Sequence, residues 1–132
     1  MAADIRWKQR FFNYDKAFSE LSSAVARESY DKLSQAGLIQ MFELTFERAW
    51  KTLKDKLEYD GLKATSPRDT LKIAFQNGYI QNGELWIEAL DNRNLLAHTY
   101  DEAKSNEAKD LIREKYFFLL KDLHQYLKKE SK

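Results

Sequence analysis

The sequence contains no cysteine, a single proline and only four glycines among its 132 residues. The absence of cysteine excludes disulfide bridges, thiol catalysis and thiolate-ligated metal. With so few residues that force a turn, a few long helices are favoured over a sandwich or barrel of short strands. No stretch approaches the roughly 18 apolar residues of a membrane-spanning helix, and the first residues lack the apolar segment of a secretion signal. We therefore expect a cytoplasmic protein without membrane contact.

An excess of charge of one sign is also missing. The 22 basic and 21 acidic side chains give a net charge of +1, so any contact with RNA must be local. The only two histidines are far apart in the sequence and have no thiols to complete a metal-ligand set. No glycine-rich phosphate loop, nucleophile elbow or zinc-protease motif is present. We expect neither a metal nor another cofactor.

The chain is rich in apolar side chains, which make up 43% of its residues, with aromatic residues at 14%. This content is sufficient for a hydrophobic core, and the length is that of one domain, residues 1–132. Apolar residues recur at intervals of three and four, which is the spacing of one helix face. The pattern covers residues 7–25, 39–57, 85–97 and about 105–129.

Local signals mark the ends of these helices. Gly61 stands where a residue just beyond a helix end is expected. Ser66-Pro67 predicts the cap and first position of a short helix, which Asn77-Gly78 ends, and Asn82-Gly83 opens the next one. We predict an all-α fold, a four-helix antiparallel up-and-down bundle with one additional short helix. Adjacent aromatics at Phe11-Phe12 and 116–118 indicate a second apolar face and hence an oligomer.

The segment from Arg93 to Tyr100 brings an arginine, a histidine and a phenol close together in the sequence. On a helical wheel Arg93 falls on the protein-facing side with Trp86 and Leu90, so it must be paired or line a cleft. His98 lies roughly 140° away on an unbroken helix. The two side chains therefore meet only if the helix ends or tightens near His98, or if a dimer shares the site.

A purely structural interpretation of these residues stays open at this point. Arg93 would then pair with Glu88 or Asp91, and His98 would be a histidine favoured by the dipole of a helix C-terminus. The chain would be a plain helical dimer. The second histidine, His124, follows Leu123 on the last helix and is interpreted as a solvated residue.

The segment resembles the R-x4-6-H motif of HEPN domains, in the form R-x4-H-x-Y, with the polar residue Asn94 directly after Arg93. Residues 37–54, Ser66-Pro67-Arg68 and residues 98–102 resemble the same branch of that family. This branch comprises the nucleotidyltransferase substrate-binding proteins, also described as HepT-type toxins.

The resemblance implies a helical homodimer that works with a separately encoded minimal nucleotidyltransferase, the MNT protein of a toxin–antitoxin pair. It implies a metal-independent endoribonuclease in which Arg93 holds the scissile phosphate, His98 acts as general acid or base and Asn94 supports them. The product would be a 2′,3′-cyclic phosphate, and Tyr100 would accept AMP from the partner. The older description implies instead a non-catalytic subunit that presents substrate to the nucleotidyltransferase.

Overall fold

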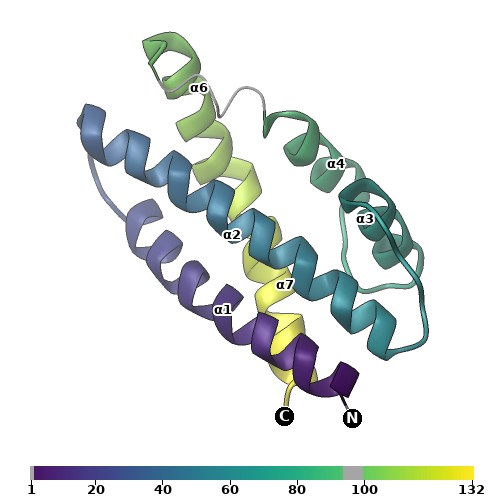
Figure 1. Ribbon diagram of the computed structural model, residues 1–132. Helices are drawn as coiled ribbons and strands as arrows, with labels where there is room; N and C mark the ends of the chain where they lie inside the picture. Colours follow the sequence, from purple (N-terminus) through teal and green to yellow (C-terminus); the bar gives the residue numbers. More distant parts are fainter. Residues whose placement is uncertain (1, 94–99) are drawn as a thin grey trace.

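The computed structural model describes residues 2–93 and 100–132, and every regular element in these ranges is helical. The all-α prediction is therefore confirmed. The labels follow Figure 1, and the elements are α1 (Ala2–Val25), α2 (Lys32–Tyr59), α3 (Pro67–Gln76), α4 (Gly83–Asp91), α6 (Glu102–Leu111), a π-helical turn (Ile112–Tyr116) and α7 (Phe117–Glu130).

The long helices run up and down the molecule. α1 and α2 form an antiparallel hairpin, and the continuous run from α6 through the π turn to α7 lies along both of them (Figure 1). α3 and α4 lie on the other side of α2, and α4 runs antiparallel to it. This arrangement confirms the antiparallel bundle, with α3 as the additional short helix. None of the described helices is long and apolar enough to span a membrane.

Aromatic side chains fill the space between the helices. The predicted apolar stripe of α1 is confirmed, because Trp7, Phe11, Tyr14 and Leu21 are all buried. The Tyr14 hydroxyl donates a hydrogen bond of 2.5 Å to the main-chain carbonyl of Leu120, which ties α1 to α7. A buried phenol that finds such a partner avoids the cost of an unsatisfied polar group.

The helix boundaries that local signals predicted are also confirmed. The Ser66 side chain accepts a hydrogen bond from the amide of Asp69, with Pro67 in the first helical position of α3. Gly61 has a φ of +90° directly after α2, and the amide of Leu62 reaches back to the carbonyl of Leu57. This is the hydrogen-bond pattern by which a left-handed residue terminates a helix.

Other boundaries differ from the prediction. α2 begins at Lys32 and not after Gly37, because Asp31 and Ser34 form a reciprocal capping box ahead of it. α6 begins at Glu102, three residues earlier than expected, because the Asp101 side chain accepts a hydrogen bond from the amide of Lys104. A carboxylate cap satisfies amides that would otherwise lack partners, and it suits the positive end of the helix dipole.

Two glycine substitutions are expected to change stability in opposite directions. Gly61→Ala should lower the free energy of unfolding by about 1–2 kcal/mol, because an alanine at a φ of +90° is strained. Gly37→Ala should raise it by about 0.5–1 kcal/mol, because Gly37 lies inside α2 and an added Cβ meets nothing within 4 Å. Urea denaturation of both variants measures the two shifts. If both substitutions changed the free energy of unfolding in the same direction, this explanation of the two glycines would be contradicted.

Candidate functional site

The residues of the R-x4-H-x-Y segment lie between the end of α4 and the start of α6. α4 ends at Asp91, Asn92 is its C-cap, and Arg93 follows directly. Tyr100 comes just before Asp101, the N-cap of α6. Asn94 and His98 fall outside the described residues, so the structure gives a position for Arg93 and Tyr100 alone among the predicted site residues.

A buried phenol holds the end of α4 in place. Tyr116, on the π-helical turn, donates a hydrogen bond of 2.7 Å to the Glu88 carboxylate and accepts one of 2.7 Å from the Asn92 side-chain amide. Its ring stacks on Phe42 of α2, with the ring centroids 5.8 Å apart. Burial and the Glu88 carboxylate raise the pKa of Tyr116 to about 12, so its hydroxyl stays a donor at neutral pH. The residue before Arg93 is therefore anchored to the π-helical turn, whose Tyr116 in turn packs on α2.

Arg93 does not occupy the protein-facing position that the helical wheel predicted. Its side chain is 49% exposed, and its Nη1 lies 3.8 Å from a carboxylate oxygen of Glu47 on α2. The wheel assumed one unbroken helix through Trp86 and Arg93, but α4 ends at Asp91. The angular relation between the two residues is lost at that boundary.

The partners proposed for Arg93 from the sequence were also wrong. Glu88 accepts the hydrogen bond of Tyr116, and Asp91 forms an ion pair with Arg68 of α3. Both carboxylates are therefore already engaged. Glu47, more than forty residues earlier in the sequence, is the carboxylate paired with the guanidinium, and the adjacent Phe46 of α2 packs against Trp86 of α4.

The surroundings of Arg93 on α2 are acidic. Glu47 also accepts a hydrogen bond of 2.9 Å from the Trp50 indole and pairs with Lys51 at 3.3 Å. One turn earlier, desolvation raises the pKa of the Glu43 carboxyl, while the positive charge of Arg93 opposes that rise. Arg93 is thus a cation facing two carboxylates, and the Glu47 carboxylate has partners of its own.

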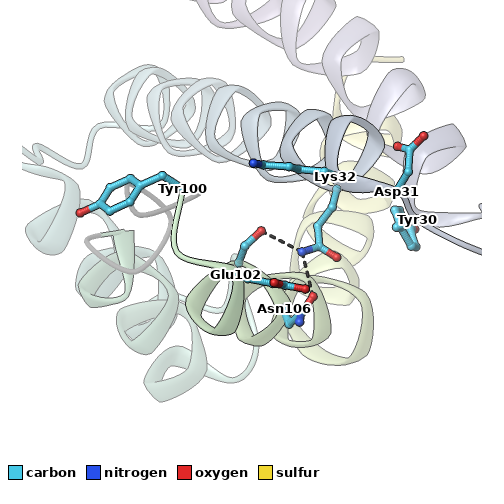
Figure 2. Close-up of a pocket in the computed structure, with 8 residues that line it drawn as sticks. Tyr30, Asp31, Lys32, Tyr100, Glu102 and Asn106 are labelled. Carbon is cyan, nitrogen blue, oxygen red and sulfur yellow. Dashed lines mark hydrogen bonds between the residues drawn. The ribbon is translucent and has the colours of Figure 1, made fainter.

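Tyr100 is strongly exposed, at 77% of its surface. Tyr100 is also one of the residues that line a cavity of about 280 Å³ between the start of α2 and α6. Figure 2 shows its ring pointing away from Glu102 and Asn106, which line the other side of that cavity. The phenol is therefore presented at the protein surface, where an enzyme can reach it.

The second histidine contradicts the interpretation made from the sequence. The His124 side chain is only 12% exposed, and its Nε2 lies 2.6 Å from Asp15 Oδ1 on α1. Its ring stacks on Phe18 at a centroid distance of 4.5 Å. His124 is thus a packed residue that connects α7 to α1. Within residues 2–93 and 100–132, no group of three potential ligands is placed to hold a metal ion.

Comparison with known proteins places this chain in a family. The family model for nucleotidyltransferase substrate binding protein-like sequences matches residues 9–129. This chain belongs to that family. It is 32% identical to a Haemophilus influenzae protein named probable ribonuclease HepT, over 69% of this chain and 70% of the relative.

Two solved structures of similar proteins have the same fold. One is a Thermus thermophilus protein with 28% identity and a TM-score of 0.79, covering 86% of this chain and 98% of its own. The other is a Haemophilus influenzae protein described as having the fold of a substrate-binding domain of a nucleotidyltransferase. It has 26% identity and a TM-score of 0.79, covering 89% of this chain and 98% of its own.

The contacts of three residues around Arg93 were not predicted from the sequence. Glu47 was part of an ordinary helix pattern, and Asn92 and Tyr116 were not connected because 24 residues separate them. The spacing of Glu47 and Trp50 on one helix face was the only local signal for any of them. Contacts between distant elements leave no such signal.

Replacing Tyr116 by phenylalanine tests the anchor at the end of α4. We expect Tyr116→Phe to lower the free energy of unfolding at pH 7 by about 1 kcal/mol, the usual net value of a hydrogen bond. The raised pKa means that the neutral phenol stabilises the folded state fully below pH ~10. That contribution is lost as the pH rises toward about 12.

Denaturant unfolding of Tyr116→Phe between pH 7 and 12 makes this measurement. The variant should lose less stability than the wild type over the alkaline part of the range. Tyr59→Phe, at an exposed position on α2, controls for the loss of a hydroxyl as such. If the free energy of unfolding fell as steeply at alkaline pH in Tyr116→Phe as in the wild type, another titrating group would be responsible for that fall.

Proposed function

We propose that this protein is a metal-independent endoribonuclease of the HepT type, inhibited by AMP transfer from a cognate nucleotidyltransferase in a toxin–antitoxin pair. The observation that carries the proposal is Arg93. It is an exposed arginine in an R-x4-H-x-Y segment, held beside α2 by a loose ion pair and anchored through the residue before it. The ribonuclease name of the Haemophilus influenzae relative supports the same assignment.

The state of Arg93 suits a phosphate-binding role. An ion pair of 3.8 Å between two half-exposed side chains contributes at most about 1 kcal/mol. An RNA phosphate can replace Glu47 at that small cost, because the guanidinium offers a planar fork of donors to two phosphoryl oxygens. Arg93 then neutralises the charge that develops on the phosphate during the reaction.

His98 supplies the proton transfer in the proposed reaction. The 2′-oxygen of the ribose attacks the phosphorus and loses its proton to a base, while the bond from phosphorus to the 5′-oxygen breaks. An acid donates a proton to that leaving oxygen, and the product is a 2′,3′-cyclic phosphate. Histidine titrates near neutral pH and performs either role, with Asn94 as the supporting polar residue. No metal or other cofactor takes part.

A homodimer brings the two motif segments together in this proposal. On an unbroken helix Arg93 and His98 point in directions roughly 140° apart, so one pocket is most readily built from two chains. Phe12 and Phe118 are exposed, as the adjacent aromatics in the sequence predicted, but they lie on α1 and α7. The proposed dimer axis, in contrast, passes near the two copies of the segment.

Tyr100 is the proposed point of regulation by a minimal nucleotidyltransferase. Its exposed phenol attacks the α-phosphorus of ATP, pyrophosphate leaves, and the phenolic proton passes to solvent or a base. The resulting AMP group adds bulk and negative charge near Arg93. RNA binding is then opposed by steric and electrostatic effects together.

The second candidate function is a non-catalytic subunit that presents substrate to the nucleotidyltransferase. It is favoured by the family description and by the description of the Haemophilus influenzae structure. Both candidates use the same fold and the same partner class. They differ in whether the chain by itself breaks a phosphodiester bond.

Cleavage of RNA in excess EDTA separates the two candidates. We expect the unmodified wild-type protein to cleave tRNA or mRNA without added metal and to leave 2′,3′-cyclic phosphate ends. Arg93→Ala and His98→Ala should each lower the rate by at least about a hundredfold, as the loss of a charge-stabilising or acid–base group does. Gel analysis and end-group mapping measure both effects.

The control for this experiment is Arg68→Ala, because Arg68 is another half-exposed arginine in an ion pair, on α3. It should retain the wild-type rate. A one-to-one mixture of Arg93→Ala and His98→Ala chains should regain part of the activity if the dimer shares its site. Equal inactivity of the wild type and all variants toward both RNAs would leave the non-catalytic subunit as the function.

AMP transfer to Tyr100 is tested by mass spectrometry. Incubation with the cognate nucleotidyltransferase, ATP and Mg²⁺ should add one or more AMP masses and reduce RNA cleavage. Tyr100→Phe should abolish the added mass, because the accepting hydroxyl is gone. The matched control is Tyr59→Phe, since Tyr59 is also exposed, and it should be modified like the wild type. A label on Tyr116 or Tyr126, or one that persists in Tyr100→Phe, would contradict the assignment.

A further inference from the structure

A groove between α1 and α2 gathers cations beside Arg93. The two helices lie side by side (Figure 1), and the groove has a volume of about 250 Å³. Glu47, the carboxylate paired with Arg93, is part of its lining, so the groove adjoins the proposed phosphate site. The other lining residues are all basic or uncharged, and they are Arg10, Asn13, Leu44, Arg48 and Lys51.

At the edge of the groove, two cations share the carboxylate of Glu47. Its Oε2 lies 3.8 Å from Nη1 of Arg93, and its Oε1 lies 3.3 Å from Nζ of Lys51. The three side chains are between 41% and 49% exposed, so both ion pairs contribute little and exchange readily with another anion. Arg93 and Lys51 are thus separated by the width of one carboxylate, and one negative charge serves two positive charges.

The two arginines of the groove differ in how their charge is balanced. Nη1 of Arg48 donates a hydrogen bond of 3.2 Å to the main-chain carbonyl of Asn13 on α1. That acceptor is uncharged, so it orients the guanidinium without cancelling its charge. Arg10, by contrast, donates a hydrogen bond of 2.5 Å from Nε to the buried carboxylate of Asp55. Arg48 and Lys51, three residues apart on α2, are therefore the groove cations best placed to bind a further anion.

This arrangement suits a chain of regularly spaced negative charges. The cations follow one another from the end of α4, at Arg93, across α2 to the α1 side, at Arg48. A nucleic acid strand carries one charge per nucleotide, and side chains that contact its phosphates fix its register. Leu44, which is 39% exposed in the same groove, offers an apolar surface to a ribose or base. A strand with a phosphate at Arg93 can therefore continue along the groove.

We propose that Arg48 and Lys51 form a second phosphate-binding site, which holds an RNA phosphate adjacent to the one at Arg93. This inference rests on the proposed function, because the strand is the ribonuclease substrate. Glu47 is the anion that the strand displaces from both Arg93 and Lys51. Arg48 and Lys51 orient the strand and take no part in bond breaking, so their loss should raise KM for RNA cleavage and leave kcat unchanged.

The test is fluorescence anisotropy with a fluorescein-labelled 2′-O-methyl oligonucleotide of mixed sequence, which lacks the attacking hydroxyl and so reports binding without cleavage. Arg48→Gln and Lys51→Gln should each weaken binding about three- to tenfold at low salt, the effect of one lost hydrogen bond to a charged group. The slope of log K against log salt concentration should fall in magnitude by about 0.7 in each variant, the value for one phosphate contact of a single strand. Thermal melting establishes that the variants are folded.

Two variants control for the loss of a positive charge as such. Lys8→Gln removes a lysine of α1 that is 43% exposed, like Lys51, and pairs with a carboxylate four residues away, as Lys51 does. Arg27→Gln removes an arginine that donates a hydrogen bond to a main-chain carbonyl, as Arg48 does. Both controls should bind the oligonucleotide like the wild type and keep its salt slope. Equal weakening in the controls and in the groove variants would refute the site.

The outcomes separate this site from the proposed function. If Arg93→Ala weakens RNA binding and the groove variants do not, the second site is refuted while the proposed function stands. If the groove variants weaken binding although the wild type cleaves no RNA, the site is supported and the nuclease fails. Absence of RNA binding by the wild type would refute both. If the groove variants bind RNA normally but lose the cognate nucleotidyltransferase, the groove is a protein interface and the RNA site is refuted.

Discussion

The hydrogen bonds of the Tyr116 hydroxyl determine how the site is assembled. They join the π-helical turn to Glu88 and Asn92 at the end of α4, while the ring of Tyr116 packs on Phe42 of α2. Three elements are thereby fixed at one buried point. Because Arg93 follows Asn92 directly, its place opposite Glu47 depends on this point. Short π turns inside helices are common at functional sites, where the additional residue redirects a side chain.

Features set by neighbouring residues were predictable from the sequence. The Ser66 cap and the left-handed Gly61 each depend on contacts within a few positions, so the residue types reveal them. The end of α4 depends on Asn92 bonding to a residue 24 positions away. No local pattern carries that information, and the helical wheel therefore extended α4 too far. The π turn escaped prediction because the same residues satisfy a regular helix pattern.

His124 and Arg93 show which features of a residue its motif and spacing can predict and which they cannot. His124 looked solvated by its position beside Leu123, yet it pairs with Asp15 across 109 residues and stacks on Phe18. His124 is buried because α1 packs across α7, and the sequence pattern of α7 alone does not predict that contact. Arg93 and Tyr100 were selected by the resemblance of their segment to a known motif, although the neighbours of Arg93 were misjudged. The motif is the source of the proposed chemistry, whereas only the packing of the helices showed that Glu47 lies opposite Arg93.

Under the proposed function, the charge balance of the chain restricts RNA binding to local contacts. With a net charge of +1, long-range attraction to a polyanion is weak, so binding must come from short-range contacts. Glu43 and Glu47 would repel a phosphate at this part of α2 if Arg93 were absent. In the proposed function, a phosphate replaces Glu47 in the exposed ion pair of Arg93, and the fork geometry of the guanidinium favours phosphate. Arg93 is thus the cation that a phosphate meets opposite Glu43 and Glu47. Under the proposed function, an AMP group near Arg93 inhibits because it places a competing phosphate beside that cation.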